Sequence, residues 1–453
     1  MPDSALGPAV PAAYPEWVIS RRLRVAAVPV VALVLIADAA AGLSVGRWLA
    51  ERSTAPVDLG ASAAPGERDS DAPRPGLRPA DRLQAEAKGL LDRRATAVLA
   101  GDAAGYLAVF AARPELQAKQ AAEFAALAAL GPSAFRYDLL DAQPAAGAVT
   151  ATEASVQARL SYRIGGVDRA DAVVAAPMAM VLEPGGWRLA GDEPADGLTR
   201  STLIWQYGPL EVVRGSRSVV VGLAGAGPVG GLAPQLDAAW GRVESVWGPA
   251  DADGALMVVP GRSDQLGALL GTDPSGWSEV AALTSGGPGG VARLYLNPAT
   301  LEALGPKARG IVLAHELTHV VTRAPTSLAS PLWLKEGFAD YVGFTDSGVA
   351  LRIATSEGLD AVRRSGTPDA WPPDADFTAG SVAAPAAYAL GHLACRAIAE
   401  RYGRDALVAF YRAVDAGAAD PAANVAAASR SILGVEADVL LAAWRSDVTS
   451  LAG

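Results

Sequence analysis

A long apolar stretch lies near the start of the chain. Residues 25–45 carry a single charge, Asp38, and follow three arginines within residues 21–24. As a helix, this stretch spans about 30 Å, which is the thickness of a bilayer core. We expect a single transmembrane helix at 25–45, with residues 1–24 in the cytoplasm because positive flanks stay inside. The alternative is a cleaved signal peptide that leaves a secreted protein, and either interpretation exports the rest of the chain.

The next two stretches differ sharply in pattern. Residues 46–80 are rich in Pro, Ala, Gly, Ser and charge, which is typical of a disordered linker. Residues 81–197 begin with helical periodicity and continue with alternating strands that are punctuated by Gly and Pro turns. One of these strands is expected to run without a break over Ala172–Leu182. Helices first and an antiparallel sheet afterwards predict an α+β domain.

Residues 200–453 alternate strands with one amphipathic helix before they become mainly helical. Strands are expected around Val219–Val221 and Leu256–Pro260, then at Val280–Thr284 and Val291–Asn297. A buried helix then follows, with apolar residues on nearly every face between Lys307 and Arg323. This order predicts a second α+β domain, with a small sheet and a mainly helical C-terminal lobe.

Composition and charge exclude some classes of partner. The chain has 453 residues, 38 basic and 48 acidic, and a formal charge of −10. An acidic chain does not favour nucleic acid as a partner. The single cysteine, Cys395, excludes an intrachain disulfide.

The buried helix carries two of the three histidines of the chain. His315-Glu316-Leu317-Thr318-His319 places two imidazoles about one turn apart on one helix face. Two imidazoles in this arrangement can bind one metal ion, and Glu316 can then act on a metal-bound water. A core helix with satisfied histidines would have to accommodate three such polar groups in an apolar environment, which is rare.

A catalytic zinc site needs a third protein ligand. The metzincin pattern would place Gly and His where the chain has Thr322 and Pro325. Carboxylates are the better candidates, and Glu336 and Asp340 lie one turn apart on the next expected helix. One of them can bind the metal while the other accepts an N–H from a metal-bound imidazole. We expect this helix to begin with Ser330 as N-cap and Pro331 at its first position.

HELTH followed by WLKEGFADY resembles the gluzincin branch of zinc metallopeptidases, and in particular the bacterial peptidase-MA-like domains. The resemblance covers roughly Pro209 to the C-terminus. It implies one zinc ion held by His315, His319 and Glu336, with Glu316 as general base. It also implies that Asp340 orients the imidazole of His315.

The same resemblance implies two further features of the site. A tyrosine from a downstream helix stabilises the oxyanion in this family, and Tyr388 lies at the matching place, with His392 as the alternative donor. The family also binds substrate backbone along an edge strand of its sheet. Val291–Leu296 is the expected edge strand.

Residues 81–197 resemble the NTF2-like or cystatin-like cone folds through GDAAGYLAVF and the strand end YRIGGVD. They contain no paired carboxylates and no His or Cys cluster that would predict catalysis. We therefore expect residues 200–453 alone to bind zinc and to cleave an unspecific peptide.

These features predict a membrane-anchored extracytoplasmic zinc peptidase that acts on a peptide or protein substrate. One alternative is a peptidase fold retained as a binding module. The other is a metal hydrolase that acts on a non-peptide amide.

Overall fold

The structure is a computed structural model, and it describes residues 79–145, 152–192, 201–225, 227, 229–271, 280–286, 291–323, 327–378 and 381–453. The expected membrane segment and linker, residues 25–45 and 46–80, lie almost entirely outside these ranges. Within the described ranges, no helix combines the length and the apolar character that a membrane span requires.

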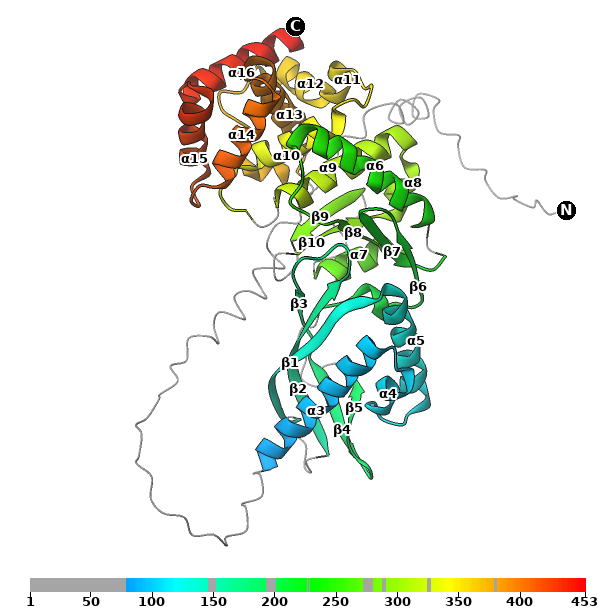
Figure 1. Ribbon diagram of the computed structural model, residues 1–453. Coiled ribbons are helices and arrows are strands. Elements are labelled where there is room, and N and C mark those ends of the chain that lie inside the picture. The colour runs from blue at the N-terminus through cyan, green and yellow to red at the C-terminus, as the bar shows by residue number, and fades with distance from the viewer. Residues whose placement is uncertain are drawn as a thin grey trace, which may run out of the picture.

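The N-terminal unit packs helices against an antiparallel sheet. Its helices are α3 (Pro79–Ala100), α4 (Ala103–Ala108) and α5 (Pro114–Leu130), and its strands are β1 (Pro132–Pro144), β2 (Glu153–Ile164), β3 (Ala172–Ala175), β4 (Met178–Glu183) and β5 (Gly186–Gly191). The strands are ordered β1-β2-β4-β5, and β3 also pairs with β2. Figure 1 shows α3 lying across this sheet. The expected α+β organisation of this part of the chain is present.

The strand predicted over Ala172–Leu182 is wrong as a single element. The chain forms β3 and β4, which both pair antiparallel with β2 but are separated by Ala176 and Pro177. Proline has no N–H to give to a strand ladder, so the break falls beside it.

A buried ion cluster lies inside the N-terminal unit, where the sequence showed no constellation. Arg94 on α3 is 2% exposed and donates to Asp192 at 2.6 Å, to Glu123 at 3.0 Å and to the hydroxyl of Tyr106 at 3.0 Å. A cavity of about 20 Å³ adjoins the cluster. Buried charges occur where they are paired and hydrogen-bonded, and this cluster joins α3, α5 and the end of β5.

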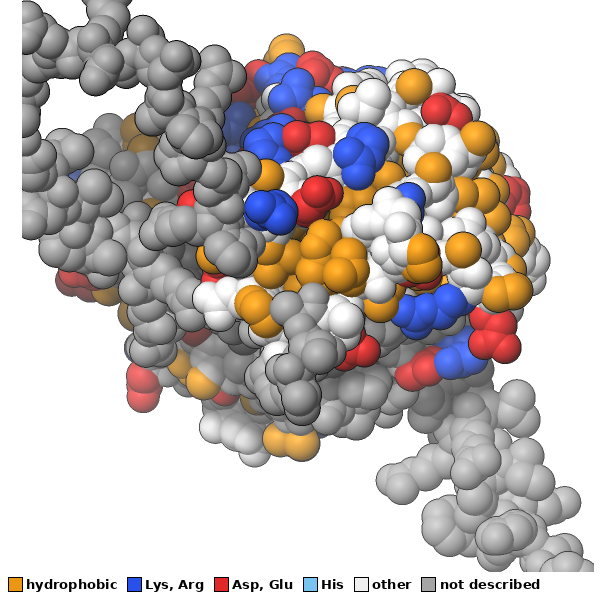
Figure 2. Space-filling view, turned by 90° about the horizontal axis from the view of Figure 1, so that it is seen from below, with side chains coloured by type: hydrophobic (Ala, Val, Ile, Leu, Met, Phe, Trp, Pro, Cys, Tyr) orange, Lys and Arg blue, Asp and Glu red, His pale blue; other side chains and the backbone are white. Residues whose placement is uncertain are grey.

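Figure 2 views the molecule from the end that the N-terminal unit forms. Hydrophobic side chains gather near the middle of this face, with basic and acidic side chains around them. The large hydrophobic residues that are exposed on the described part of this unit are Leu99, Leu140 and Leu182. The face mixes apolar and charged groups, as protein surfaces generally do.

A second sheet forms the middle of the molecule (Figure 1). Its strands are β6 (Leu210–Arg214), β7 (Ser218–Leu223), β8 (Ala255–Val259), β9 (Ala282–Gly286) and β10 (Ala292–Leu296), and the helices between them are α6 (Val229–Trp247) and α7 (Ser263–Leu270). The order is β6-β7-β8-β10-β9. The three inner strands are parallel, and β6 and β9 pair antiparallel at the two edges.

Both faces of this sheet are buried. On β7, Val220 packs with α6 and the helices that follow, whereas Val219 and Val221 join the core of the N-terminal unit. On β8, Met257 faces the helices, and Leu256 and Val258 face the N-terminal unit. This alternation follows from the period of two along a strand, and continuous apolar runs are typical of parallel strands that are covered on both sides. One face of this sheet therefore belongs to the hydrophobic core of the N-terminal unit, and the other face belongs to the core of the helices that follow.

A buried ion pair adds to this contact. Arg293 on β10 donates to Asp168 of the N-terminal unit at 2.6 Å, and the two side chains are 5% and 1% exposed. Asp168 also accepts from the backbone N–H of Ile164 at 2.8 Å. Because the two opposite charges are buried in contact with each other, the pair ties β10 to the turn after β2.

The expectation that Val291–Leu296 forms an edge strand is wrong. This segment is β10, which lies between β8 and β9 and pairs with both. The edge strands are β6 and β9, and β9 (Ala282–Gly286) is the edge strand that contacts α9. The alternation of apolar residues in β10 is compatible with an edge strand or an inner strand, and only the order of strands in the sheet decides between the two.

The helical lobe follows the sheet and lies at the other end of the molecule from the N-terminal unit (Figure 1). Its helices are α8 (Pro298–Ala303), α9 (Pro306–Thr322), α10 (Leu332–Phe344), α11 (Leu351–Ala354), α12 (Ser356–Ser365), α13 (Ala384–Tyr402), α14 (Arg404–Asp415), α15 (Pro421–Ala428) and α16 (Ala437–Ala452). Helices α6 and α9 cover the sheet, and α10 packs between α9 and α13.

Two glycines let α10 and α13 approach closely. A Cβ on Gly337 of α10 would lie 2.2 Å from the backbone oxygen of Gly391 on α13, and one on Gly391 would lie 2.8 Å from the backbone oxygen of Trp333. Only residues without a side chain fit this crossing. It fixes α13 against the helix that carries Glu336.

Candidate metal centre

Helix α9 begins and ends where its sequence requires. Gly305 is the N-cap and Pro306 occupies the first turn, while Arg323 closes the helix in the left-handed conformation. Between them, every residue from Ile311 to His319 is buried. The helix is therefore held on all sides, and His315, Glu316 and His319 project from it into the protein interior.

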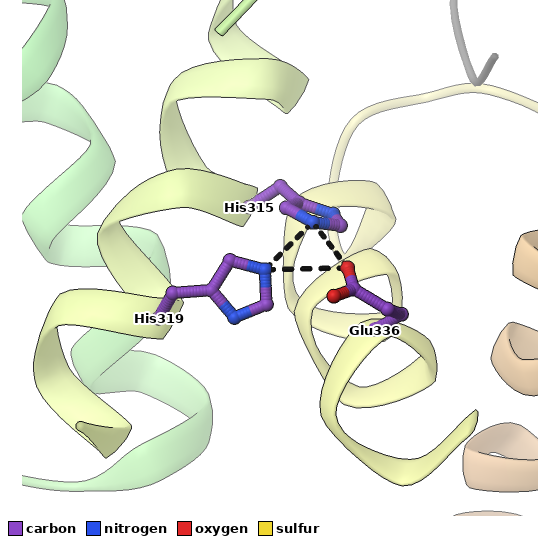
Figure 3. A group of neighbouring side chains, drawn as sticks. All are labelled: His315, His319 and Glu336. Atoms are coloured by element: carbon purple, nitrogen blue, oxygen red, sulfur yellow. Dashed lines mark hydrogen bonds and ion pairs between the residues drawn. The ribbon is translucent and has the colours of Figure 1, made fainter. Parts of the chain in front are cut away.

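Three polar atoms from two helices converge on one point. The Nε2 atoms of His315 and His319 lie 3.0 Å apart, and Oε2 of Glu336 lies 3.2 Å and 3.3 Å from them. Figure 3 shows the two imidazoles on α9 turned toward the carboxylate of Glu336 on α10. Among the residues that the structure describes, this is the one group of His, Cys, Asp and Glu side chains that could hold a metal ion.

The second helix differs from expectation only at its start. Helix α10 begins at Leu332 with Pro331 as N-cap, and Ser330 donates its hydroxyl to Asp415 instead of capping the helix. The carboxylate of Asp374 takes the capping role and accepts from the N–H of Leu332 at 2.8 Å. A cap supplied from 42 residues away cannot be recognised in the local sequence.

Asp340 contacts the other nitrogen of the first imidazole. Its Oδ1 lies 2.8 Å from Nδ1 of His315, so the proton on Nδ1 is held by the carboxylate and Nε2 can present its lone pair to the point between the three atoms. Glu336 and Asp340 lie one turn apart on α10 and contact opposite sides of the same ring. Glu336 therefore faces the candidate metal position, whereas Asp340 contacts Nδ1 of the His315 ring, away from that position.

The electrostatics of the group follow from burial and close charges. Burial alone lowers the pKa of His315, but Asp340 and Glu336 raise it to about 10. Burial raises the pKa of Glu316 to about 8. Burial opposes ionisation of Glu336, yet the two imidazoles hold its pKa down at about 2. The site gathers three carboxylates around two imidazoles, an excess of acidic groups that a bound cation would offset.

The residues present fit a zinc ion. Ligand atoms about 2.0–2.1 Å from a tetrahedral zinc lie about 3.3–3.4 Å from one another, and the three atoms here are separated by 3.0–3.3 Å. Two imidazoles and one carboxylate form a donor set that catalytic zinc sites use, and that set leaves the fourth position open.

Zinc affinity is expected to rise with pH. The raised pKa of His315 means that the metal-free site holds a proton on this ring at neutral pH, and zinc must displace it. Release of the proton of His315 makes Kd fall at least about tenfold for each pH unit between pH 6 and 8, and release of the proton of Glu316 steepens this fall. Competition with a chelator of known proton affinity at three pH values measures this slope.

The matched variant for this measurement is Asp340→Asn. Without the negative charge beside Nδ1, the pKa of His315 falls, so the slope should flatten while zinc binding becomes weaker overall. A Kd that stays constant across this pH range in the unmodified protein would contradict the expected proton displacement.

A threonine on the edge strand completes the surroundings of Glu316. Thr284 on β9 is fully buried and donates its hydroxyl to Oε2 of Glu316 at 2.6 Å, while Oε1 of Glu316 has no hydrogen-bond partner among the described residues. Thr284 was not among the expected site residues. The only indication in the sequence is that it is a polar residue near the end of an apolar strand, at a position where the side chain points into the protein.

The two candidate oxyanion donors occupy different surroundings. The ring of Tyr388 lies 6.3 Å from that of His315, between centroids, and its hydroxyl is buried without a hydrogen-bond partner among the described residues. Burial and three nearby carboxylates raise the pKa of Tyr388 well above its usual value, so it stays a donor. His392 instead stacks on Phe344 at 5.3 Å, and burial lowers its pKa to about 4. The histidine is therefore neutral at physiological pH and belongs to the packing of α10 on α13.

The whole group is closed to solvent. His315, Glu316, His319, Glu336, Asp340 and Tyr388 are each at most 4% exposed. A peptide can reach these side chains only after the surrounding side chains or backbone rearrange.

Comparisons with known proteins give a weak structural likeness. No protein-family model matches the chain, and no curated protein matches it. The M1 zinc metallopeptidase from Deinococcus radiodurans, crystallised as a mutant bound to a Tyr-Ser-Ala substrate, is 15% identical with a TM-score of 0.34 over 65% of this chain and 90% of that chain. Another crystal structure of the M1 zinc metallopeptidase from this organism is 17% identical with a TM-score of 0.33 over 70% and 64% of the two chains. At these scores the likeness carries no weight for function.

Proposed function

We propose that the chain is a zinc-dependent peptidase that hydrolyses peptide bonds with a metal-activated water. The observation that carries this proposal is the convergence of three ligand atoms at 3.0–3.3 Å beside a buried glutamate, one oxygen of which has no hydrogen-bond partner among the described residues. In this proposal, His315, His319 and Glu336 hold one zinc ion, and Asp340 fixes the ring of His315.

Zinc, when bound, supplies a Lewis acid that polarises the substrate carbonyl and makes the attacking water more acidic. Glu316 accepts the proton of that water at Oε1, which has no partner in the described part of the chain, and passes it to the leaving amine. A divalent cation nearby lowers the pKa of Glu316 from its raised value in the metal-free site, so the base is ionised when it is needed.

Tyr388 is the donor that we propose for the developing negative charge. Its hydroxyl is buried and protonated, and it lies near the carboxylate of Glu336. Donors held in advance in a dry site contribute more to stabilising such a charge than they would in water.

Strand β9 is the proposed binding edge for the substrate backbone. It is one of the two edge strands of the sheet, and its Thr284 contacts Glu316 directly. A peptide that adds as a further strand would pass beside the base. This replaces the earlier expectation for β10.

The test is cleavage of a mixed peptide library by the purified protein, together with measurement of bound metal. We expect one zinc ion per chain, cleavage that a chelator abolishes, and recovery when zinc is added. A protein that binds zinc but cleaves no peptide would contradict the proposal. Binding of peptides without cleavage would then support the binding module, and cleavage of other amides would support the non-peptide hydrolase.

We also propose that the protein is membrane-anchored with its catalytic part outside the cytoplasm. This proposal rests on the apolar stretch and its arginines in the sequence alone. Protease added to intact spheroplasts should digest the folded part, and full protection without lysis would contradict this placement.

A further inference from the structure

The hydroxyl of Thr284 has one set of contacts in the described structure, and all belong to Glu316. Oγ1 lies 2.6 Å from Oε2 of Glu316 and 3.0 Å from its backbone oxygen. Because a hydroxyl carries one proton, it donates to the carboxylate of Glu316, once that group is ionised, in preference to the weaker carbonyl acceptor.

Packing alone does not require a hydroxyl at this position. Ala282 and Thr284 share the face of β9 that meets α9, and the residue paired with Thr284 on β10 is the apolar, buried Leu294. Valine has nearly the same shape as threonine and buries no polar group, and an unpaired buried hydroxyl is costly. The contact with Glu316 offsets that cost.

Thr284 also has the stiffness that a positioning group needs. A β-branched side chain has few χ1 states, and strand β9 is held by five residue pairs with β10. The hydroxyl direction is therefore set by the sheet, whereas Glu316 has a longer and more flexible side chain on α9.

We propose that Thr284 is a positioning residue that holds Oε2 of Glu316 and thereby leaves Oε1 as the oxygen that takes up the proton. This inference rests on the proposed function, because it assigns Glu316 the role of base. It also ties the proposed substrate strand to the base, since both features belong to β9.

The experiment compares Thr284→Val, Thr284→Ser and Thr355→Val in the full chain. Thr355 is the matched control, because it is also fully buried and its hydroxyl donates to the backbone oxygen of Leu351. We expect Thr284→Val to keep its zinc content, its zinc Kd and its KM within about twofold, and to lose about 10–100-fold in kcat, the loss expected when a hydrogen bond to a charged group is removed. Thr284→Ser should restore most of kcat, and Thr355→Val should leave it unchanged.

A second readout does not depend on turnover. In the zinc-loaded protein, the infrared carboxylate band that disappears in Glu316→Gln should shift in Thr284→Val and stay in place in Thr355→Val. An unshifted band, or a Thr284→Val protein with unchanged kcat, overturns the inference about Thr284 while wild-type cleavage still supports the proposed function. A Thr284→Val protein that loses zinc, with no rescue by serine, shows a merely structural role and also overturns it. If the wild-type protein cleaves nothing, the proposed function fails, and the band shift still reports whether the contact exists.

Discussion

Glu316→Gln is expected to retain one zinc ion per chain and to lose turnover by at least about 10²–10⁴-fold, the range typical of a missing general base. Glutamine keeps the size of the side chain, and its amide oxygen can still accept from the hydroxyl of Thr284. Glutamine carries an amide nitrogen in place of the second carboxylate oxygen, so the side chain can no longer take up the proton of the water. The metal ligands are untouched, so the effect should fall on kcat.

Glu336→Gln is the matched change on the other helix. The carboxylate of Glu336 contacts both Nε2 atoms, and its charge holds them together in the metal-free protein. An amide oxygen is a weaker ligand than a carboxylate, so zinc occupancy should fall and added zinc should restore activity only in part.

The two variants separate the roles by metal analysis and by single-turnover cleavage under excess enzyme. The assignment requires that Glu316→Gln keeps metal without turnover and that Glu336→Gln loses metal. If Glu316→Gln lost the metal while Glu336→Gln kept both metal and turnover, the third ligand would have to be sought elsewhere.

The local features of the site were predictable because they depend on short spacings. Gly305, Pro306 and the apolar run define α9, and the four-residue spacing from His315 to His319 places both rings on one face. The same spacing between Glu336 and Asp340 places two carboxylates on one face of α10. Helical periodicity alone leads to these arrangements.

The features that depend on the path of the chain were not predictable. Thr284 and Glu316 lie 32 residues apart, and they meet because β9 forms the edge of the sheet while β10 returns between β8 and β9. The sequence order of β9 and β10 is compatible with either strand at the edge. For the same reason, Asp374 could not be recognised as the cap of α10.

Side-chain surroundings explain the difference between Tyr388 and His392. The two residues are four positions apart on α13, so both face α10. The upstream position meets His315, whereas the downstream position meets Phe344 near the end of α10. Helical spacing alone does not separate them, the family resemblance placed Tyr388 first, and their different neighbours agree with that order.

Residues 201–453 alone are expected not to fold, in contrast to the expectation from sequence that they work without the N-terminal unit. Val219, Val221, Leu256 and Val258 are at most 5% exposed and face that unit. Each such side chain contributes about 1.5–3 kcal/mol when buried, so exposing four of them removes about 6–12 kcal/mol. This equals most of the stability of a typical domain, about 5–15 kcal/mol.

The measurement is a thermal melt of the fragment followed by circular dichroism, with zinc binding as a second readout. The expected result is no cooperative transition and no stoichiometric zinc. The control is the full protein carrying a protease site between Asp192 and Ser201, cut after folding. This nicked protein retains the shared core and the Arg293–Asp168 pair, so it should melt cooperatively and keep its zinc. A fragment that melts cooperatively and binds one zinc ion would show that the sheet tolerates an open face, and the N-terminal unit would then be separable from the chemistry.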